Sequence, residues 1–145
     1  MYFDRNDYFE GDYDKSEEGV NQINLYYTEM IAGKGWSGVV SADFNNNEYS
    51  VGHPALSPDG KTLYFVSDMT GGKGMSDMYK ASIMADGTVG TPQRLGDNIN
   101  TEGKELFPFV DSNGTIYFSS DGHLGIGGLD VFYAEASGSD FGGVN

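Results

Sequence analysis

The chain has 145 residues, the length of one ordinary domain, and its 8 Lys and Arg against 22 Asp and Glu give a formal charge of −14. So acidic a chain lacks the broad basic surface on which nucleic acids and other polyphosphates bind, and we exclude these partners. It has no cysteine, which excludes disulfides, thiolate metal sites and cysteine nucleophiles, and it has no run of about 18 apolar residues for direct membrane insertion.

The chain repeats itself, and its first segment holds an incomplete copy of the repeat. Tyr2-Phe3 corresponds to Tyr64-Phe65, and Asn24-Leu25-Tyr26 corresponds to Asp77-Met78-Tyr79. The interval between the two motifs is nine residues longer in this first copy, and the extra segment holds the acidic run 12–18. Because this insertion departs from the repeat, it is a place where we expect specific function, with a solvated surface loop as the alternative.

The middle copy predicts four β-strands in succession. Ser57-Pro58-Asp59-Gly60 has the composition of a tight turn, because Pro presets φ and Gly accepts a positive φ, so it joins strands at 53–56 and 62–67 into a hairpin. Residues 62–67 are almost continuously apolar or aromatic, which predicts a strand covered on both faces. The remaining elements are a Gly-rich loop over 68–76, a strand over 77–83, a turn at Asp86-Gly87 and a short strand around 93–95.

The last copy follows the middle one at an offset of 54 and then 53 residues. Residues 108–114 match 54–60, and residues 116–121 match 63–68, so we expect both aromatic pairs, at 64–65 and 117–118, to pack in the core between units. Further matches are Asp77-Met78-Tyr79 with Asp130-Val131-Phe132, Trp36 with Val89 and Phe141, and Asn46-Asn47-Glu48 with Asn100-Thr101-Glu102.

Four strands recurring about every 53 residues, without helical periodicity, predict an all-β fold, namely a β-propeller of four-stranded antiparallel blades. A β-helix is the competing repeat architecture, but its coils are much shorter. The blades are 1–47, which is partial, 48–101 and 102–145. These make about two and two-thirds blades, whereas closed propellers have about four to eight. We therefore expect the chain to be part of a larger propeller, with a ring of several copies as the alternative.

Residues 53–68 resemble the repeat of TolB-type, WD-repeat-like propellers. Asn100-Thr101-Glu102-Gly103, Phe107-Pro108-Phe109 and the segment 124–132 are similar to the propeller repeat of OmpA-family envelope proteins of Bacteroidetes, some of which belong to the type IX secretion and gliding apparatus. The resemblance covers nearly all of the chain. It implies a periplasmic, outer-membrane-associated protein that docks other envelope proteins. It implies contact with peptidoglycan only through a separate domain outside this sequence.

Four aspartates border the two Gly-rich loops and are candidates for metal binding, because Ca²⁺ prefers carboxylate and carbonyl oxygens. Asp68 and Asp77 flank the first loop, and Asp121 and Asp130 flank the second. The alternative is that each carboxylate accepts hydrogen bonds from loop amides and fixes the turn. We favour this structural role, since the pair recurs in both full units, and we expect no obligatory cofactor.

The other patterns do not support catalysis. Gly71-Gly72-Lys73-Gly74 would need a following helix to hold a phosphate, and a strand follows instead. His53 and His123 have no second His or Cys nearby, and the sequence lacks the G-x-S-x-G turn of a serine nucleophile. We therefore expect that the chain is not an enzyme.

The order of strands in a propeller predicts that the loops 48–52, 68–77, 100–104 and 121–130 lie on one face, which is rich in Gly, Asn and acidic residues. We take this face, together with the acidic insertion, as the partner-binding surface, and we expect Tyr26 and Trp36 of the irregular first unit to be exposed. The candidate partner-binding residues are Asp12, Asp14, Glu17, Glu18, Tyr26, Trp36, Glu48 and Glu102.

Two functions from different classes follow from these patterns. The first is a non-catalytic scaffold of the cell envelope that binds other proteins through the loop face, because an acidic surface suits a basic partner. The alternative is a carbohydrate- or peptide-binding sensor, assisted by Ca²⁺, with its ligand at the mouth of the channel.

Overall fold

The computed structural model describes residues 1–9, 12–13 and 15–145, and within them every regular element is a β-strand. All ladders between these strands are antiparallel. The strands are β1 (Tyr2–Asn6), β2 (Tyr8–Phe9), β3 (Asp12–Tyr13), β4 (Ile23–Tyr27), β5 (Met30–Ile31), β6 (Gly35–Trp36), β7 (Val40–Ser41), β8 (Val51–Leu56), β9 (Thr62–Ser67), β10 (Asp77–Ser82), β11 (Gln93–Arg94), β12 (Glu105–Val110), β13 (Ile116–Ser120), β14 (Asp130–Ala134), β15 (Ala136–Ser137) and β16 (Asp140–Phe141).

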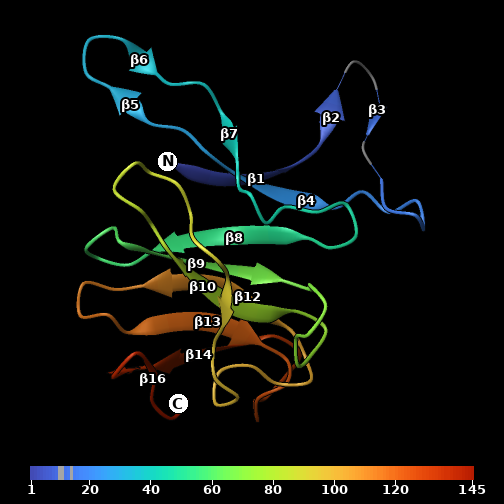
Figure 1. Ribbon diagram of the computed structural model, residues 1–145. Helices are drawn as coiled ribbons and strands as arrows, with labels where there is room; N and C mark the ends of the chain where they lie inside the picture. The colour runs from blue at the N-terminus through green and yellow to red at the C-terminus, as the bar shows by residue number, and fades with distance from the viewer. Residues whose placement is uncertain (10–11, 14) are drawn as a thin grey trace.

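Three larger sheets follow one another along the chain (Figure 1). The first has the order β1-β4-β7, the second β11-β10-β9-β8 and the third β12-β13-β14, while β2-β3, β5-β6 and β15-β16 form two-stranded ribbons. The edge strands β1, β8 and β12 lie next to one another, because β8 contacts both β1 and β12. The three sheets therefore share one edge region, and their faces pack against each other in chain order.

The core consists of two layers between successive sheets. The layer between the first and second sheets is built on Leu25, Leu63 and Phe65, which are fully buried. The layer between the second and third sheets includes Met78 and Phe118, which are also buried. Each sheet thus needs a neighbour on its apolar faces, as is typical of stacked repeats.

The second unit forms the four strands expected from its sequence. Ser57 accepts a hydrogen bond from the Gly60 amide at 2.9 Å, and Gly60 has a φ of +69°, so the predicted hairpin turn between β8 and β9 is present. Strand β10 pairs with β9 along six residues and with the short strand β11 on its other side. In the third unit, Tyr133 and Asn145 exchange two backbone hydrogen bonds of 3.0 Å beside β14, the side on which β11 lies in the second unit.

The predicted match of Trp36, Val89 and Phe141 is confirmed by strand pairing. Trp36 pairs with Met30, Val89 pairs with Ile83, and Phe141 pairs with Ala136, each in a hairpin after the third strand of its unit. Val89 and Phe141 are buried, whereas Trp36 is 54% exposed. The first unit therefore keeps the hairpin and exposes its aromatic residue.

The predicted match of Asn46 with Asn100 is wrong by one residue. Asn100 is fully buried and clamps Met78, accepting from its amide at 2.8 Å and donating to its carbonyl at 3.0 Å. Asn45, and not Asn46, makes the same pair of bonds with Leu25, at 2.9 and 2.6 Å. Three consecutive asparagines left the register ambiguous in the sequence, and the side-chain geometry selects Asn45.

The expectation that both aromatic pairs pack in the core is wrong for Tyr117. Phe65 and Phe118 are buried, and Tyr64 packs against the layer between the second and third sheets. Tyr117 instead lies on the opposite face of the third sheet and is 37% exposed. On that face no described residue covers a row of apolar side chains, which comprises Phe109, Tyr117, Val131 and Tyr133.

Candidate functional site

Four loops form one continuous surface at the end of the sheets where β9 ends and β10 begins, on the right in Figure 1. We call it the loop face, and it comprises residues 48–52, 68–77, 100–104 and 121–130. The Ser50 amide donates to Asp68 Oδ1 at 2.7 Å, and the Met75 amide donates to the Gly103 carbonyl at 2.8 Å. The Lys104 amide donates to Asp121 Oδ1 at 2.7 Å. The prediction that these loops share a face is thus confirmed.

The four aspartates proposed for metal binding brace the loops. Asp77 Oδ2 accepts from the amides of Lys73 and Gly74 at 2.8 and 3.0 Å. Asp130 Oδ2 accepts from the amides of Ile126 and Gly127 at 2.8 and 3.0 Å. Asp68 and Asp121 accept from the neighbouring loops, as described above. In the part of the chain that the structure describes, no three His, Cys, Asp or Glu side chains are grouped to hold a metal ion.

The acidic insertion approaches the loop face at its described end. The Glu17 amide donates to Glu48 Oε1 at 3.1 Å, so these two candidate residues lie together. Glu17, Glu18, Glu48 and Glu102 are all exposed. Asp14 lies outside the described residues, and Asp12 is described only by the backbone of β3.

The two aromatic candidates of the first unit do not join this surface. Tyr26 is buried, with 7% of its surface exposed, so the expectation that it is exposed is wrong. The Arg5 guanidinium lies 4.5 Å from the centre of the Tyr26 ring, and the Tyr26 hydroxyl donates to Asp7. Trp36 is exposed, as expected, but its β5-β6 ribbon follows the far end of β4, opposite the loop face (Figure 1).

The loop face also carries exposed apolar side chains that the sequence analysis missed. Leu124 and Ile126 are fully exposed, and Met75 and Leu129 are 63% and 49% exposed. The available signal was a departure from the repeat, since Gly71 and Lys73 stand where the third unit has Leu124 and Ile126. Apolar side chains rimmed by polar residues are typical of interaction surfaces.

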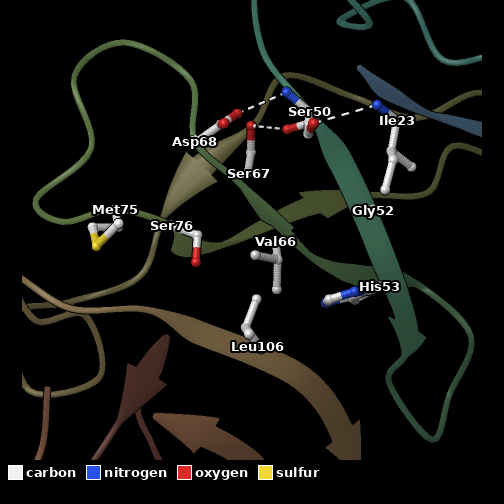
Figure 2. A pocket seen from close by; sticks show the side chains of 10 residues that line it. All are labelled: Ile23, Ser50, Gly52, His53, Val66, Ser67, Asp68, Met75, Ser76 and Leu106. Atoms are coloured by element: carbon white, nitrogen blue, oxygen red, sulfur yellow. Dashed lines mark hydrogen bonds between the residues drawn. The ribbon is translucent and has the colours of Figure 1, made fainter. Parts of the chain in front are cut away.

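His53 lines two hollows in the region where β1, β8 and β12 meet. The first, of about 190 Å³, is shown in Figure 2 and is lined chiefly by apolar groups, including Ile23, Val66 and Leu106. The second is an open groove of about 400 Å³, and it is lined by Phe3, Asp4, His53, Pro54, Phe107 and Pro108. No Lys or Arg is among the residues that line either cavity.

His53 is held in one orientation by its neighbours. Its φ of +52° and the φ of +53° at Phe107 are unusual for residues with side chains, and both lie at the bulges of β8 and β12. The two rings stack with centroids 4.4 Å apart, and the Phe107 amide donates to His53 Nδ1 at 3.3 Å. Because Nδ1 accepts, the proton of the neutral ring is on Nε2.

Asp4 is a charged group in direct contact with His53. Its Oδ2 accepts from the His53 amide at 2.6 Å. Burial lowers the pKa of His53 below its usual 6.5, and the Asp4 charge opposes this shift. The ring is therefore predominantly neutral at pH 7.

The hydroxyl groups near His53 are engaged in other bonds. Ser67 Oγ donates to the Ser50 carbonyl at 2.6 Å, and Ser50 Oγ donates to Gln22 Oε1 at 2.6 Å (Figure 2 shows the bonds among Ser67, Ser50 and Ile23). His123, the other histidine, bonds the Ile99 carbonyl through Nε2 at 2.8 Å and packs against aromatic rings. The arrangement is suited to holding a ligand, and the described residues form no hydroxyl–imidazole pair for nucleophilic attack.

The described residues include no helix of the length and apolarity needed to span a bilayer. A comparison of the sequence with models of known protein families, and with functionally curated proteins, finds no match.

Proposed function

We propose that the chain is a non-catalytic, protein-binding scaffold and that its three sheets are blades of a β-propeller. The propeller proposal is supported by the contact between β8 and β12, which are the first strands of the second and third units, and by the recurring order of strands in these two units. Strand β1, which the repeat matches with β9, contacts β8 from the first unit. The exposed apolar face of the third sheet supports it too, because the corresponding face of the second sheet is covered by a neighbouring sheet of the same repeat. In this proposal, another such sheet covers the exposed face.

The observation that carries the binding function is the composition of the loop face. Leu124 and Ile126 are fully exposed on a surface whose loops also expose Glu48 and Glu102. Burying such apolar side chains against a partner is favourable, and the surrounding carboxylates would select a partner with basic groups. The loop-bracing hydrogen bonds hold this surface in shape before binding, which lowers the entropic cost of association.

The cellular setting is proposed from the resemblance to OmpA-family envelope proteins of Bacteroidetes. The segment 124–132, which carries part of that resemblance, also carries the exposed side chains of the loop face. We place the chain in the periplasm in association with the outer membrane, with other envelope proteins, such as components of a secretion or gliding complex, as its partners. Each of the four loop aspartates accepts at least one hydrogen bond from a backbone amide, and the proposal assigns no cation to them.

Quantitative capture from the envelope fraction of the source cell tests the proposal. The double variant Leu124→Ser/Ile126→Ser should reduce the captured partner at least about tenfold, because two exposed apolar anchors are lost. The matched control is Met30→Ser/Met84→Ser, which removes two exposed apolar side chains (60% and 54%) at the opposite end of the sheets. Equal capture by the parent chain and the loop-face variant would contradict the proposal.

A second candidate function is favoured by the cavities beside His53. Their position at the shared edge of the sheets corresponds to the central channel of the proposed propeller. A peptide-binding sensor would hold its ligand there.

A further inference from the structure

We propose that the open groove of about 400 Å³ beside His53 binds the guanidinium group of an arginine side chain presented by a peptide. The inference rests on the second candidate function, since both place a ligand at this cavity, and it is independent of the loop face. Three features of the cavity carry it: a carboxylate with a free oxygen, a rigid pair of stacked rings, and a lining without positive charge.

Asp4 supplies the carboxylate. Its Oδ2 is held by the His53 amide at 2.6 Å, whereas no described residue donates to its Oδ1, and no described Lys or Arg forms an ion pair with it. Gly52 makes this arrangement possible, because a Cβ at this position would lie 2.7 Å from Asp4 Oδ2. The third unit has Leu106 at the position of Gly52, so the space for Asp4 is specific to the second unit.

Phe107 and His53 supply flat surfaces. Phe107 is 59% exposed although it is apolar, and its ring is fixed against His53 by stacking and by a bond from its own amide to Nδ1. A guanidinium is planar and weakly hydrated, so it stacks on aromatic faces more readily than an ammonium does. Pro54 and Pro108 add rigid apolar walls on the two neighbouring strands.

The backbone holds these rings in place before any ligand arrives. Positive φ angles at two residues with side chains cost free energy, and such strained positions are common at binding sites. Because the His53 ring is predominantly neutral at pH 7, it does not repel a cation beside Asp4. The chain as a whole carries a formal charge of −14, which favours the approach of a cationic group.

The test is titration of the whole chain with acetyl-Gly-Arg-Gly-amide, followed by amide chemical shifts in two-dimensional NMR. The control peptide replaces arginine with citrulline, which has nearly the same shape and no charge. We expect saturable shifts at Gly52, His53 and Phe107 with the arginine peptide and at least about tenfold weaker binding of the citrulline peptide. Equal binding of the two peptides would overturn the guanidinium assignment and leave the second candidate function standing. Binding of neither peptide would overturn both.

Variants locate the contact. Asp4→Asn should lower the affinity for the arginine peptide about tenfold. Phe107→Leu, which keeps much of the bulk and removes the ring, should lower it about threefold. Glu135→Gln makes the same change of charge at an exposed position outside the cavity and should have no effect. If Asp4→Asn fails to fold, as judged by the spread of its amide signals, Phe107→Leu and the citrulline control still test whether the guanidinium binds at this site. If both single variants, Phe107→Leu and Asp4→Asn, bind the arginine peptide as tightly as the parent chain does, the proposed contact is overturned.

Discussion

The second unit, residues 48–101, and the third, residues 102–145, use the same hydrogen bonds in their loops. Asp77 and Asp130 each accept from two loop amides at 2.8 and 3.0 Å. Ser67 and Ser120 each accept from an amide two residues later, at 3.1 and 3.0 Å. These polar positions therefore serve the fold, and their recurrence in the sequence reflects a structural requirement of each unit.

The two units differ at three consecutive positions of the first strand. The second unit has Val51-Gly52-His53, and the third has Glu105-Leu106-Phe107. Both triplets lie at a bulge with a positive φ at the third residue. The shared backbone thus presents different chemistry in each copy, and the cavities lie at these departures. In a repeat, the positions that differ locate a site better than the positions that recur.

Replacing Glu105 by Val gives the third unit the residue of the second and has the largest expected effect. Glu105 is fully buried and accepts from the Thr101 amide, the Thr101 hydroxyl and the Ser120 hydroxyl at 3.0, 2.6 and 2.8 Å. Val accepts none of these bonds, so we expect the free energy of unfolding to fall by about 3 kcal/mol. Urea denaturation measures the difference.

The matched control is Glu105→Gln, which keeps one acceptor oxygen. Its free energy of unfolding should fall by less than that of Glu105→Val. A Glu105→Val variant as stable as the parent would mean that apolar packing replaces the network, as Val51 packs in the second unit. The two units would then be interchangeable at this position.

Replacing the loop aspartates tests the feature that the units share. Asp77→Asn should lower the free energy of unfolding by about 2 kcal/mol, because the side chain is 1% exposed and its new amide group would replace the buried Oδ1, which has no described partner. Asp130→Asn should cost about 0.5 kcal/mol, since Asp130 is partly exposed and water can satisfy the amide. Chemical denaturation of both variants gives the comparison. Equal costs would show that burial does not distinguish the two loops.

The sequence predicted the elements of the second unit because their signals are local. The turn at 57–60, the strand at 62–67 and the short strand near 93 all appear where composition and repetition placed them. The common loop face followed from the order of strands. The errors arose where an environment is set by distant packing: Tyr26 is covered by Arg5 and bonded to Asp7, and Tyr117 lies on a face that no described sheet covers.

The site beside His53 could not be predicted from the sequence, for a related reason. Asp4 and His53 are 49 positions apart and meet only because β1 and β8 are adjacent edge strands. The sequence did hold one usable signal, which is the mismatch of Val51-Gly52-His53 with Glu105-Leu106-Phe107 within an otherwise regular repeat. The metal-binding hypothesis for the loop aspartates came from their positions at the borders of the Gly-rich loops, and the hydrogen bonds of Asp77 and Asp130 favour the structural role that the sequence analysis preferred.

The pH dependence of stability should distinguish His53 from its counterpart Phe107, which does not titrate, and this is the smallest expected effect. The pKa of His53 is lowered by burial from its usual 6.5, with Asp4 opposing. Between the lowered pKa and 6.5 the unfolded chain binds a proton that the folded chain does not, so the free energy of unfolding rises with pH in this window. The contribution is complete above pH 6.5 and is lost as the pH falls through the lowered pKa.

The variant His53→Asn removes this titration while keeping an acceptor and a residue that tolerates a positive φ. Subtracting its unfolding free energy from that of the parent cancels the carboxylates, which titrate in both chains. We expect the difference to shift in favour of the variant as the pH is lowered from about 7.5 to about 5. Parallel curves for the two chains would mean that His53 takes up its proton equally in the folded and unfolded states. The pKa of His53 would then be the same in the folded and unfolded chains. Such a result would remove the argument that the His53 ring beside Asp4 is predominantly neutral at pH 7.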